Sequence, residues 1–459
     1  MAKSEVTGAE YNVHKRNLLF YMVQPYVKAL FLKFYGKVEV KGQENIPRNE
    51  PVIFAPNHQN ALMDALIVLF SSPQDIVFLA RADVFNKKVL AKFLNSMKML
   101  PVFRQRDGAS ELGKNVDIFD ISVNVLHHRH YLCVMPEGNH GHQRKLRTIV
   151  KGIFRIAFKA QEEYGDKPFV KIVPVGIDMG HYVKQNQPLL IQYGKPIEMS
   201  EYWKEYEESN PRGINAVKQR LGEELLPLMI HIESDEFYDS IMDLKKIFNA
   251  RMREILGISG AKLSDKFVAD KELIARIDTA LEKDPEPVRN LAGKVDKYMV
   301  GLEKMKIRDW VVRDHGYGPM RSLWRYLTLI VTFPFFLYGF IPNAIPYLLP
   351  VYLVRNMKDK QFQSSVKNFL GILLLFPWLY ILMTLAVGLI TGGPWWIWVG
   401  FLISLPLMGK VALIWYLRGK KTVRGSWFGS QIRRKNEEAV NLAQLREEIL
   451  TLTEQVIGG

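Results

Sequence analysis

Three long apolar stretches near the C-terminal end constrain this chain more than any other feature of its sequence. They cover residues 323–354, 369–391 and 394–417, and Lys410 is the only charge within the last two. Each of those two has the roughly 20-residue length that a helix needs to cross a bilayer. We therefore expect both to be transmembrane helices joined by a tight turn. Buried core helices of a soluble domain are the alternative.

The stretch 323–354 differs from the other two because prolines interrupt it, so one straight helix is not expected. Basic residues flank its start, its connection to 369 and the end of the last stretch, whereas the turn at 391–393 carries none. By the positive-inside tendency, all these flanks belong on the cytoplasmic side. The sequence thus predicts a re-entrant or broken hairpin over 323–354, within a membrane domain spanning 321–425.

The overall charge points to an anionic partner. The net charge is +15, which suits an acidic membrane face, a phosphorylated substrate or nucleic acid. The sequence contains no zinc finger, recognition helix or ribonucleoprotein motif, so we expect no nucleic-acid partner. The single cysteine, Cys133, excludes an internal disulfide.

Residues 37–232 alternate short β-rich runs with helical candidates near 61–71, 85–97, 110–128 and 149–163. This alternation predicts an α/β fold, a mixed sheet flanked by helices. The other expected segments are an interfacial amphipathic helix within 1–36, a charged helical subdomain over 233–320 and a final amphipathic helix within 426–459. The first of these helices has an alternative position, packed on the soluble core.

A histidine and an aspartate stand in the otherwise apolar stretch PVIFAPNHQNALMDALIVLF, residues 51–70. His58 follows a predicted strand and Asp64 lies in the predicted helix, a connection where pockets of α/β sheets usually open. A neutral imidazole can take a proton from an alcohol, and a carboxylate on its other nitrogen would fix its tautomer. No serine lies in the motif, and Cys133 lies in an apolar run, so we expect a substrate hydroxyl to be the nucleophile. A structural His–Asp pair is the alternative.

Three further stretches carry candidate residues, one after a short apolar run and two where predicted strands end. LPVFRQRDG carries two arginines, whose planar guanidinium groups suit a phosphate. VMPEGNHGH offers a glycine that lets backbone amides approach a ligand, beside a glutamate that can hold a substrate hydroxyl or an arginine. IVPVGID ends a strand at a proline. The candidate residues are Arg104, Arg106, Pro136, Glu137, Gly138 and Pro174.

In this order, the four stretches resemble the glycerol-phosphate acyltransferase family, which includes glycerol-3-phosphate and lysophosphatidate acyltransferases. The resemblance covers about residues 37–200. The family's N-H-x4-D block is matched by Asn57, His58 and Asp64, its arginine block by Arg104, its P-E-G block by Pro136, Glu137 and Gly138, and its V-P-V block by Val173, Pro174 and Val175.

Two departures from the family pattern matter. Five residues separate His58 from Asp64 instead of four, as in the fungal-type glycerol-3-phosphate acyltransferases, which the longer chain also resembles. A regular helix would turn Asp64 well away from His58, so the extra residue must be absorbed in the loop. GNHGH also replaces the usual threonine-arginine-serine, and a nearby cation is expected to substitute: Arg144, Lys145 or Arg147.

The resemblance implies transfer of a fatty acyl group from acyl-CoA or acyl-carrier protein to a hydroxyl of glycerol-3-phosphate or 1-acylglycerol-3-phosphate. His58 would be the general base and Asp64 its orienting partner. The expected substrate-binding residues are Asn57, Arg104, Arg106, Pro136, Glu137, Gly138 and Pro174. Neither a cofactor nor a metal is implied. The catalytic domain is expected on the cytoplasmic face of a bacterial inner membrane or endoplasmic reticulum.

Three other functions fit parts of the sequence. The acceptor can be another lysophospholipid or an amino-lipid, since these suit the same residues. A non-catalytic lipid-binding adaptor on this fold is the second. A metal hydrolase is the third, because imidazoles bind zinc and five histidines crowd one region, although their spacing matches no known site: His127, His128, His130, His140 and His142.

Overall fold

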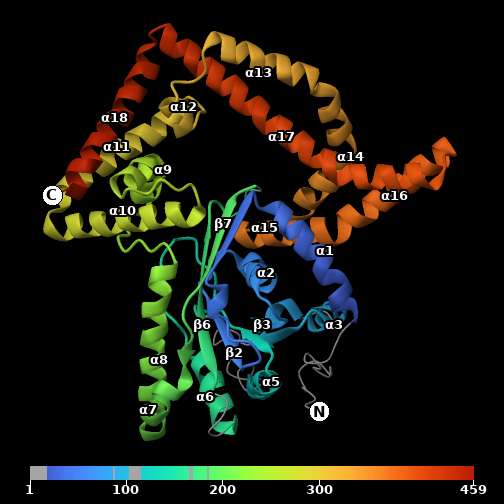
Figure 1. The fold of residues 1–459 in the computed structure, drawn as a ribbon, viewed down its shortest axis with the longest axis vertical. Coiled ribbons are helices and arrows are strands. Elements are labelled where there is room, and N and C mark those ends of the chain that lie inside the picture. Colours follow the sequence, from blue (N-terminus) through green and yellow to red (C-terminus); the bar gives the residue numbers. More distant parts are fainter. Residues whose placement is uncertain are drawn as a thin grey trace. The chain divides into compact units, whose positions relative to one another are not determined.

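The computed structural model describes residues 18–85, 88–102, 115–164, 169–182, 184 and 186–458 (Figure 1). The chain divides into two compact units. The first takes the residues up to His231 and a short later segment, Asp359–Ser365. The second takes Ile232–Lys358 and Val366–Gly459.

An 8-stranded mixed sheet forms the centre of the first unit. Its order is β1-β7-β6-β2-β5-β3-β4, with β8 also paired to β6. β6 runs antiparallel to β7 and β8, and the other neighbouring pairs are parallel. The strands are β1 (Lys37–Lys41), β2 (Val52–Pro56), β3 (Ile76–Arg81), β4 (Met99–Val102), β5 (Tyr131–Cys133), β6 (Lys171–Met179), β7 (Pro188–Tyr193) and β8 (Ile197–Glu198).

The central strand β2 is buried along its whole length, and its alternate residues enter two separate cores. Ile53 and Ala55 join a core with apolar side chains of α5, α6 and α8. Val52 and Phe54 join a core with side chains of α1 and α2. The helices of this unit are α1 (Leu18–Phe34), α2 (Ala61–Ser71), α3 (Lys88–Ser96), α5 (Asn115–His127), α6 (Gly152–Tyr164), α7 (Trp203–Glu208) and α8 (Asn210–Leu225). The predicted α/β fold, with helices on a mixed sheet, is confirmed.

Helix α1 is amphipathic along its length. Phe31 and Phe34 are buried in the core beneath α2, and the Phe31 ring lies 5.1 Å from that of Phe70. At the other end of the helix, Phe20 is also buried, whereas Leu18 and Met22 are exposed. The C-terminal part of α1 is therefore packed on the sheet unit, and an interfacial position of this helix at a membrane stays a prediction.

The second unit is entirely helical in its described residues. Asp284 separates α10 from α11: its side chain accepts a hydrogen bond from the Glu286 backbone N–H, and Pro285 begins α11. Its helices are α9 (Tyr238–Ile255), α10 (Leu263–Lys283), α11 (Pro285–Lys304), α12 (Asp309–Arg313), α13 (Pro319–Val331), α14 (Phe333–Val354), α16 (Phe376–Thr391), α17 (Trp395–Arg433) and α18 (Glu437–Gly458). Helix α15 (Lys360–Phe369) begins in the first unit and ends in the second.

Two helices are long and apolar enough to cross a membrane, α14 and α17, among the residues that the structure describes. The proline-rich stretch 323–354 consists of α13 and α14, which meet at Thr332, and α14 continues through three prolines. The stretch 369–391 contains a π-helical segment, Leu370–Leu375, followed by α16. Whether 323–354 re-enters the membrane stays a prediction.

The turn between α16 and α17 forms a tight hairpin. Gly392 ends α16 in the left-handed conformation, with φ at 58°, which favours glycine. A Cβ atom on Gly388 would lie 2.2 Å from the Trp398 ring, so this glycine allows the two helices to approach closely.

Candidate active site

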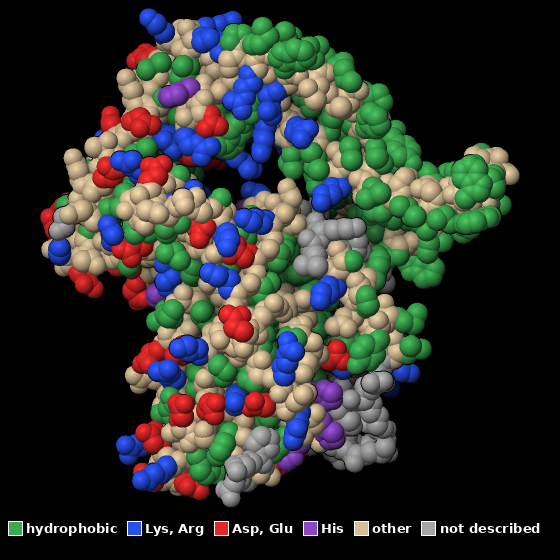
Figure 2. Space-filling model, viewed as in Figure 1, with side chains coloured by type: hydrophobic (Ala, Val, Ile, Leu, Met, Phe, Trp, Pro, Cys, Tyr) green, Lys and Arg blue, Asp and Glu red, His purple; other side chains and the backbone are tan. Residues whose placement is uncertain are grey.

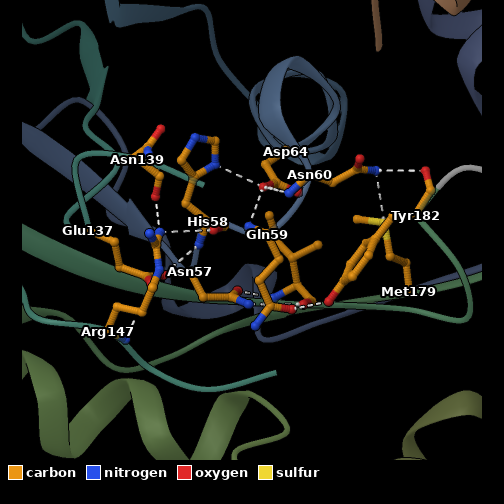
Figure 3. Close-up of polar contacts among 11 residues, drawn as sticks. Asn57, His58, Gln59, Asn60, Asp64, Glu137, Asn139, Arg147, Met179 and Tyr182 are labelled. Atoms are coloured by element: carbon orange, nitrogen blue, oxygen red, sulfur yellow. Dashed lines mark hydrogen bonds and ion pairs between the residues drawn. The ribbon is translucent and has the colours of Figure 1, made fainter. Parts of the chain in front are cut away.

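The loop between β2 and α2 wraps around the carboxylate of Asp64 (Figure 3). Its Oδ2 accepts hydrogen bonds from the backbone N–H groups of Gln59 and Asn60, at 2.8 and 2.7 Å. The same oxygen lies 2.9 Å from Nδ1 of His58. Asp64 is 1% exposed and is positioned in the first turn of α2, where the helix dipole favours a negative charge.

This arrangement defines the state of the imidazole. An ionised carboxylate only accepts hydrogen bonds, so Nδ1 of His58 carries the proton and Nε2 presents its lone pair. The His58 side chain is 13% exposed, so the ring is partly accessible. A histidine held in this way can act as a general base through Nε2.

The extra residue between His58 and Asp64 is accommodated at the start of α2. Ala61 has a φ of 44°, in the left-handed region that residues other than glycine rarely adopt. The chain therefore reverses sharply between the histidine and the helix. Asp64 therefore reaches the imidazole despite the extra residue, with the sharp turn at the first residue of α2 and not within the preceding loop.

Asn57 links the end of β2 to β6. Its side-chain amide donates to the carbonyl of Ile177 at 3.2 Å, and its side-chain oxygen accepts from the Ile177 N–H at 2.7 Å. Asn57 is 1% exposed. Its polar groups therefore hold the strand end that carries His58.

Glu137 lies beneath His58 with a fully buried side chain. Its Oε1 accepts a hydrogen bond from the backbone N–H of His58 at 2.8 Å. Its Oε2 lies 2.8 Å from Nε of Arg147, which also contacts the carbonyl oxygens of His58 and Asn139 (Figure 3). Of the two partners expected for Glu137, a substrate hydroxyl or an arginine, the structure provides the arginine.

Arg144 holds a different part of the same loop. Its guanidinium group is buried and contacts the carboxylate of Asp178 and the carbonyl of Met179, both at the end of β6. The two arginines that the sequence offers as replacement charges thus each have a carboxylate partner.

A known family matches this part of the chain. Residues 37–178, which include His58, Asp64 and Glu137, match the family model described as Acyltransferase. We refer to this segment as the acyltransferase domain, after the family model that it matches. A solved structure with a likeness to the chain is the 1-acyl-sn-glycerophosphate acyltransferase of Thermotoga maritima, with 21% identity and a TM-score of 0.30 over 44% of this chain and 80% of that one. No curated protein matches the sequence.

The remaining predicted residues of the acyltransferase domain take varied positions. Arg104 and Arg106 lie outside the described residues. Pro136 is buried, and its carbonyl accepts from the Val150 N–H at 2.8 Å. Gly138 has a φ of 68°, which a turn after β5 requires. Pro174 is buried in β6, in register with Ala55 of β2.

Sequence reasoning missed two neighbours of the histidine. The His140 ring lies 5.8 Å from the His58 ring, and Nε2 of His140 lies 2.8 Å from Oδ2 of Asp359. His140 stood out in the sequence only as one of several clustered histidines. Asp359 lies 219 residues from His140 along the chain, and the one signal that marked it is that it is the only acidic residue between His315 and Asn436.

A second polar network lies beside the loop between β2 and α2. Gln59 accepts a hydrogen bond from the Tyr182 hydroxyl at 2.6 Å, and the Asn60 side chain donates to Met179 Sδ and to the Tyr182 carbonyl (Figure 3). These contacts tie the loop after His58 to the end of β6.

The environment of Cys133 in the acyltransferase domain agrees with a hydroxyl nucleophile from the substrate. The thiol is buried in β5, and burial, with a smaller contribution from the charge of Asp64, raises its pKa. The reactive thiolate is therefore suppressed.

The clustered histidines form no metal centre within the described part of the chain, where no group of three His, Cys, Asp or Glu side chains could hold an ion. Nε2 of His127 instead lies 3.5 Å from Glu163, and its ring is 4.3 Å from that of Tyr164, while His128 contacts the Asn124 carbonyl.

Proposed function

We propose that this protein is a membrane-bound O-acyltransferase of phospholipid synthesis. It moves a fatty acyl group from acyl-CoA or acyl-carrier protein to a hydroxyl of glycerol-3-phosphate or 1-acylglycerol-3-phosphate. The observation that carries this proposal is the 2.9 Å contact between His58 Nδ1 and Asp64 Oδ2. This contact keeps the proton of His58 on Nδ1, so that Nε2 can act as a base, in a domain that matches the acyltransferase family.

The proposed reaction is direct transfer without an acyl-enzyme. Nε2 of His58 takes the proton of the acceptor hydroxyl while that oxygen attacks the thioester carbonyl carbon. Asp64 stabilises the imidazolium that forms. The tetrahedral intermediate then collapses with breakage of the carbon–sulfur bond, and the imidazolium returns its proton to the leaving thiolate. Positioned proton transfer of this kind contributes about 10²–10⁴-fold to the rate.

We propose that Arg104 binds the phosphate group of the acceptor, with a further contribution from Arg106. Arg144 and Arg147 both have carboxylate partners, which leaves less of their charge for a ligand. Guanidinium groups bind phosphate through paired hydrogen bonds. Glu137 and Arg147 support the loop instead, by fixing the backbone of His58.

The membrane location rests on the apolar helices of the second unit. In their most apolar windows, 22% of α14 and 11% of α17 is buried, whereas core helices of a soluble domain would be mostly buried. Figure 2 shows hydrophobic side chains gathered over the part of this unit that holds α13, α14 and α16. A lipid environment covers such surfaces. We place the acyltransferase domain on the cytoplasmic face, following the basic flanks.

The test is an acyl-transfer assay with the full chain in membranes. A labelled acyl thioester is offered with glycerol-3-phosphate, 1-acylglycerol-3-phosphate and other lysophospholipids. Transfer to either glycerol-phosphate acceptor is expected, and His58→Ala should abolish it. Asp64→Asn should lower kcat by about 10²–10⁴-fold with little change in KM, because the ring loses its tautomer control. His142→Ala, an exposed histidine of a nearby loop, is the matched control. Near-normal turnover by His58→Ala would refute the mechanism.

A further inference from the structure

Asp359 is an unusual residue for its place in the chain. From His315 to Asn436 it is the only acidic residue, and it lies between Lys358 and Lys360 in the basic connection before the second apolar stretch. Yet the segment that it begins, Asp359–Ser365, belongs to the same compact unit as the acyltransferase domain.

Both oxygens of this carboxylate have defined partners. Oδ1 accepts a hydrogen bond from the backbone N–H of Phe362 at 3.0 Å, which caps the start of α15. Oδ2 lies 2.8 Å from Nε2 of His140, whose side chain is 8% exposed. The cap fixes the direction of the carboxylate, so Asp359 holds His140 in a single orientation.

His140 in turn lies against the catalytic histidine. The two rings are 5.8 Å apart between centroids and inclined at 78°, an edge-to-face contact. Burial lowers the pKa of His140 despite the opposing effect of Asp359, so the ring is neutral near pH 7. Its Nε2 therefore carries the proton that faces Asp359. His58–Asp64 and His140–Asp359 are two carboxylate–imidazole pairs in contact.

We propose that Asp359 and His140 are positioning residues for His58, supplied in part by the connection between the apolar helices. This inference rests on the proposed function. The His140 ring limits rotation of the His58 ring, which Asp64 holds from the other side. The Asp359 carboxylate, one imidazole away, favours the positive charge that His58 gains when it removes the hydroxyl proton. Both effects act on the chemical step and not on substrate binding.

Kinetics of the full chain in membranes test the proposal. Asp359→Asn keeps the shape of the side chain and removes its charge. We expect kcat to fall about tenfold, within the range known for outer partners of metal-bound imidazoles. The KM values for acceptor and thioester should stay within about twofold, since ground-state binding is retained. His140→Ala should have a similar effect, and the double variant should be no worse than either single variant. Asp359→Glu should restore part of the rate, and His142→Ala should leave it unchanged.

A second measurement does not depend on turnover. The rate at which diethyl pyrocarbonate labels His58 at pH 8 is followed by mass spectrometry of the His58 peptide. Loss of the Asp359 charge should make the His58 ring less nucleophilic, so Asp359→Asn should label more slowly than wild type and His142→Ala at the wild-type rate. Unchanged or faster labelling of Asp359→Asn, or a change in KM alone, would overturn the proposal. Slower labelling in a chain that transfers no acyl group would leave the positioning role in place and refute the proposed function instead.

Discussion

Glu137 supports His58 through the backbone and not through the imidazole. One carboxylate oxygen accepts from the His58 N–H at 2.8 Å, and the other binds Arg147, whose guanidinium group reaches the His58 carbonyl at 3.4 Å. The peptide groups on both sides of His58 are thus fixed by one ion pair, in which the Glu137 side chain is fully buried. The glutamate of the Pro136–Glu137–Gly138 block therefore stabilises the backbone around His58, in addition to any contact with substrate.

Glu137→Gln should therefore destabilise the fold as well as slow transfer. The substitution retains the acceptor for the His58 N–H but leaves Arg147 without its carboxylate, and we expect a loss of about 1–3 kcal/mol in the free energy of unfolding. Arg147→Gln should lose at least as much, because it leaves the fully buried carboxylate of Glu137 without its charged partner, whereas Arg147 itself is 34% exposed and can be hydrated. Thermal unfolding of the purified chain, with the double variant included, measures the coupling. Additive losses would show that the two side chains do not act as a pair.

Asn57→Ala should act on stability more than on acceptor binding. It leaves both the N–H and the carbonyl of Ile177 without their buried partner, which is worth about 1–3 kcal/mol for an unsatisfied group. The expected result is a lower unfolding temperature with an unchanged acceptor KM in the fraction that remains folded. A raised KM at wild-type stability would instead assign Asn57 to the substrate.

The left-handed backbone conformation of Ala61 predicts opposite effects on stability for two substitutions. Glycine adopts a positive φ without steric cost, so Ala61→Gly should raise the free energy of unfolding by up to about 1 kcal/mol and leave kcat unchanged. Ala61→Val should lower it by about 1–3 kcal/mol, since a β-branched side chain is strained there. Thermal unfolding of the two variants measures both changes in stability. Destabilisation by glycine would mean that this residue is not left-handed in solution.

Cys133 should be unreactive towards thiol reagents in the folded protein. Its pKa is raised, so the thiol stays protonated as the pH increases through the range where exposed cysteines ionise. We expect the folded protein to resist thiol-alkylating reagents at pH 7 and pH 9 alike, and to react after unfolding. Cys133→Ala should retain transfer activity. Rapid alkylation together with loss of transfer activity would instead support Cys133 as the nucleophile.

The sequence predicted the architecture of the first unit well. The strands and helices follow from short-range patterns: β2 is a continuous apolar run because both its faces are buried, and α2 occupies the expected residues 61–71. The short strand β4 was missed as a strand, because its four residues are too few for a pattern. Such signals depend on residues that are neighbours along the chain.

The candidate site was only partly predictable for the same reason. Residue types and order pointed to His58, Asp64 and Glu137, because imidazoles and carboxylates inside apolar sequence require partners. The sequence left open whether Glu137 holds a substrate or an arginine, and which cation lies nearby. In the structure, the loop after β5 folds so that Arg147 pairs with Glu137 and Arg144 pairs with Asp178.

The sequence by itself determined an α/β domain with a histidine at a strand-to-helix connection, and apolar stretches of membrane-spanning length. Tertiary structure alone decided that Asp64 reaches the imidazole despite one extra residue, through the left-handed turn at Ala61, and that Asp359 meets His140. The physical reason is that periodicity and burial can be recognised from residues that are neighbours along the chain. A contact between distant side chains depends instead on backbone turns and on how the sheet brings remote loops together.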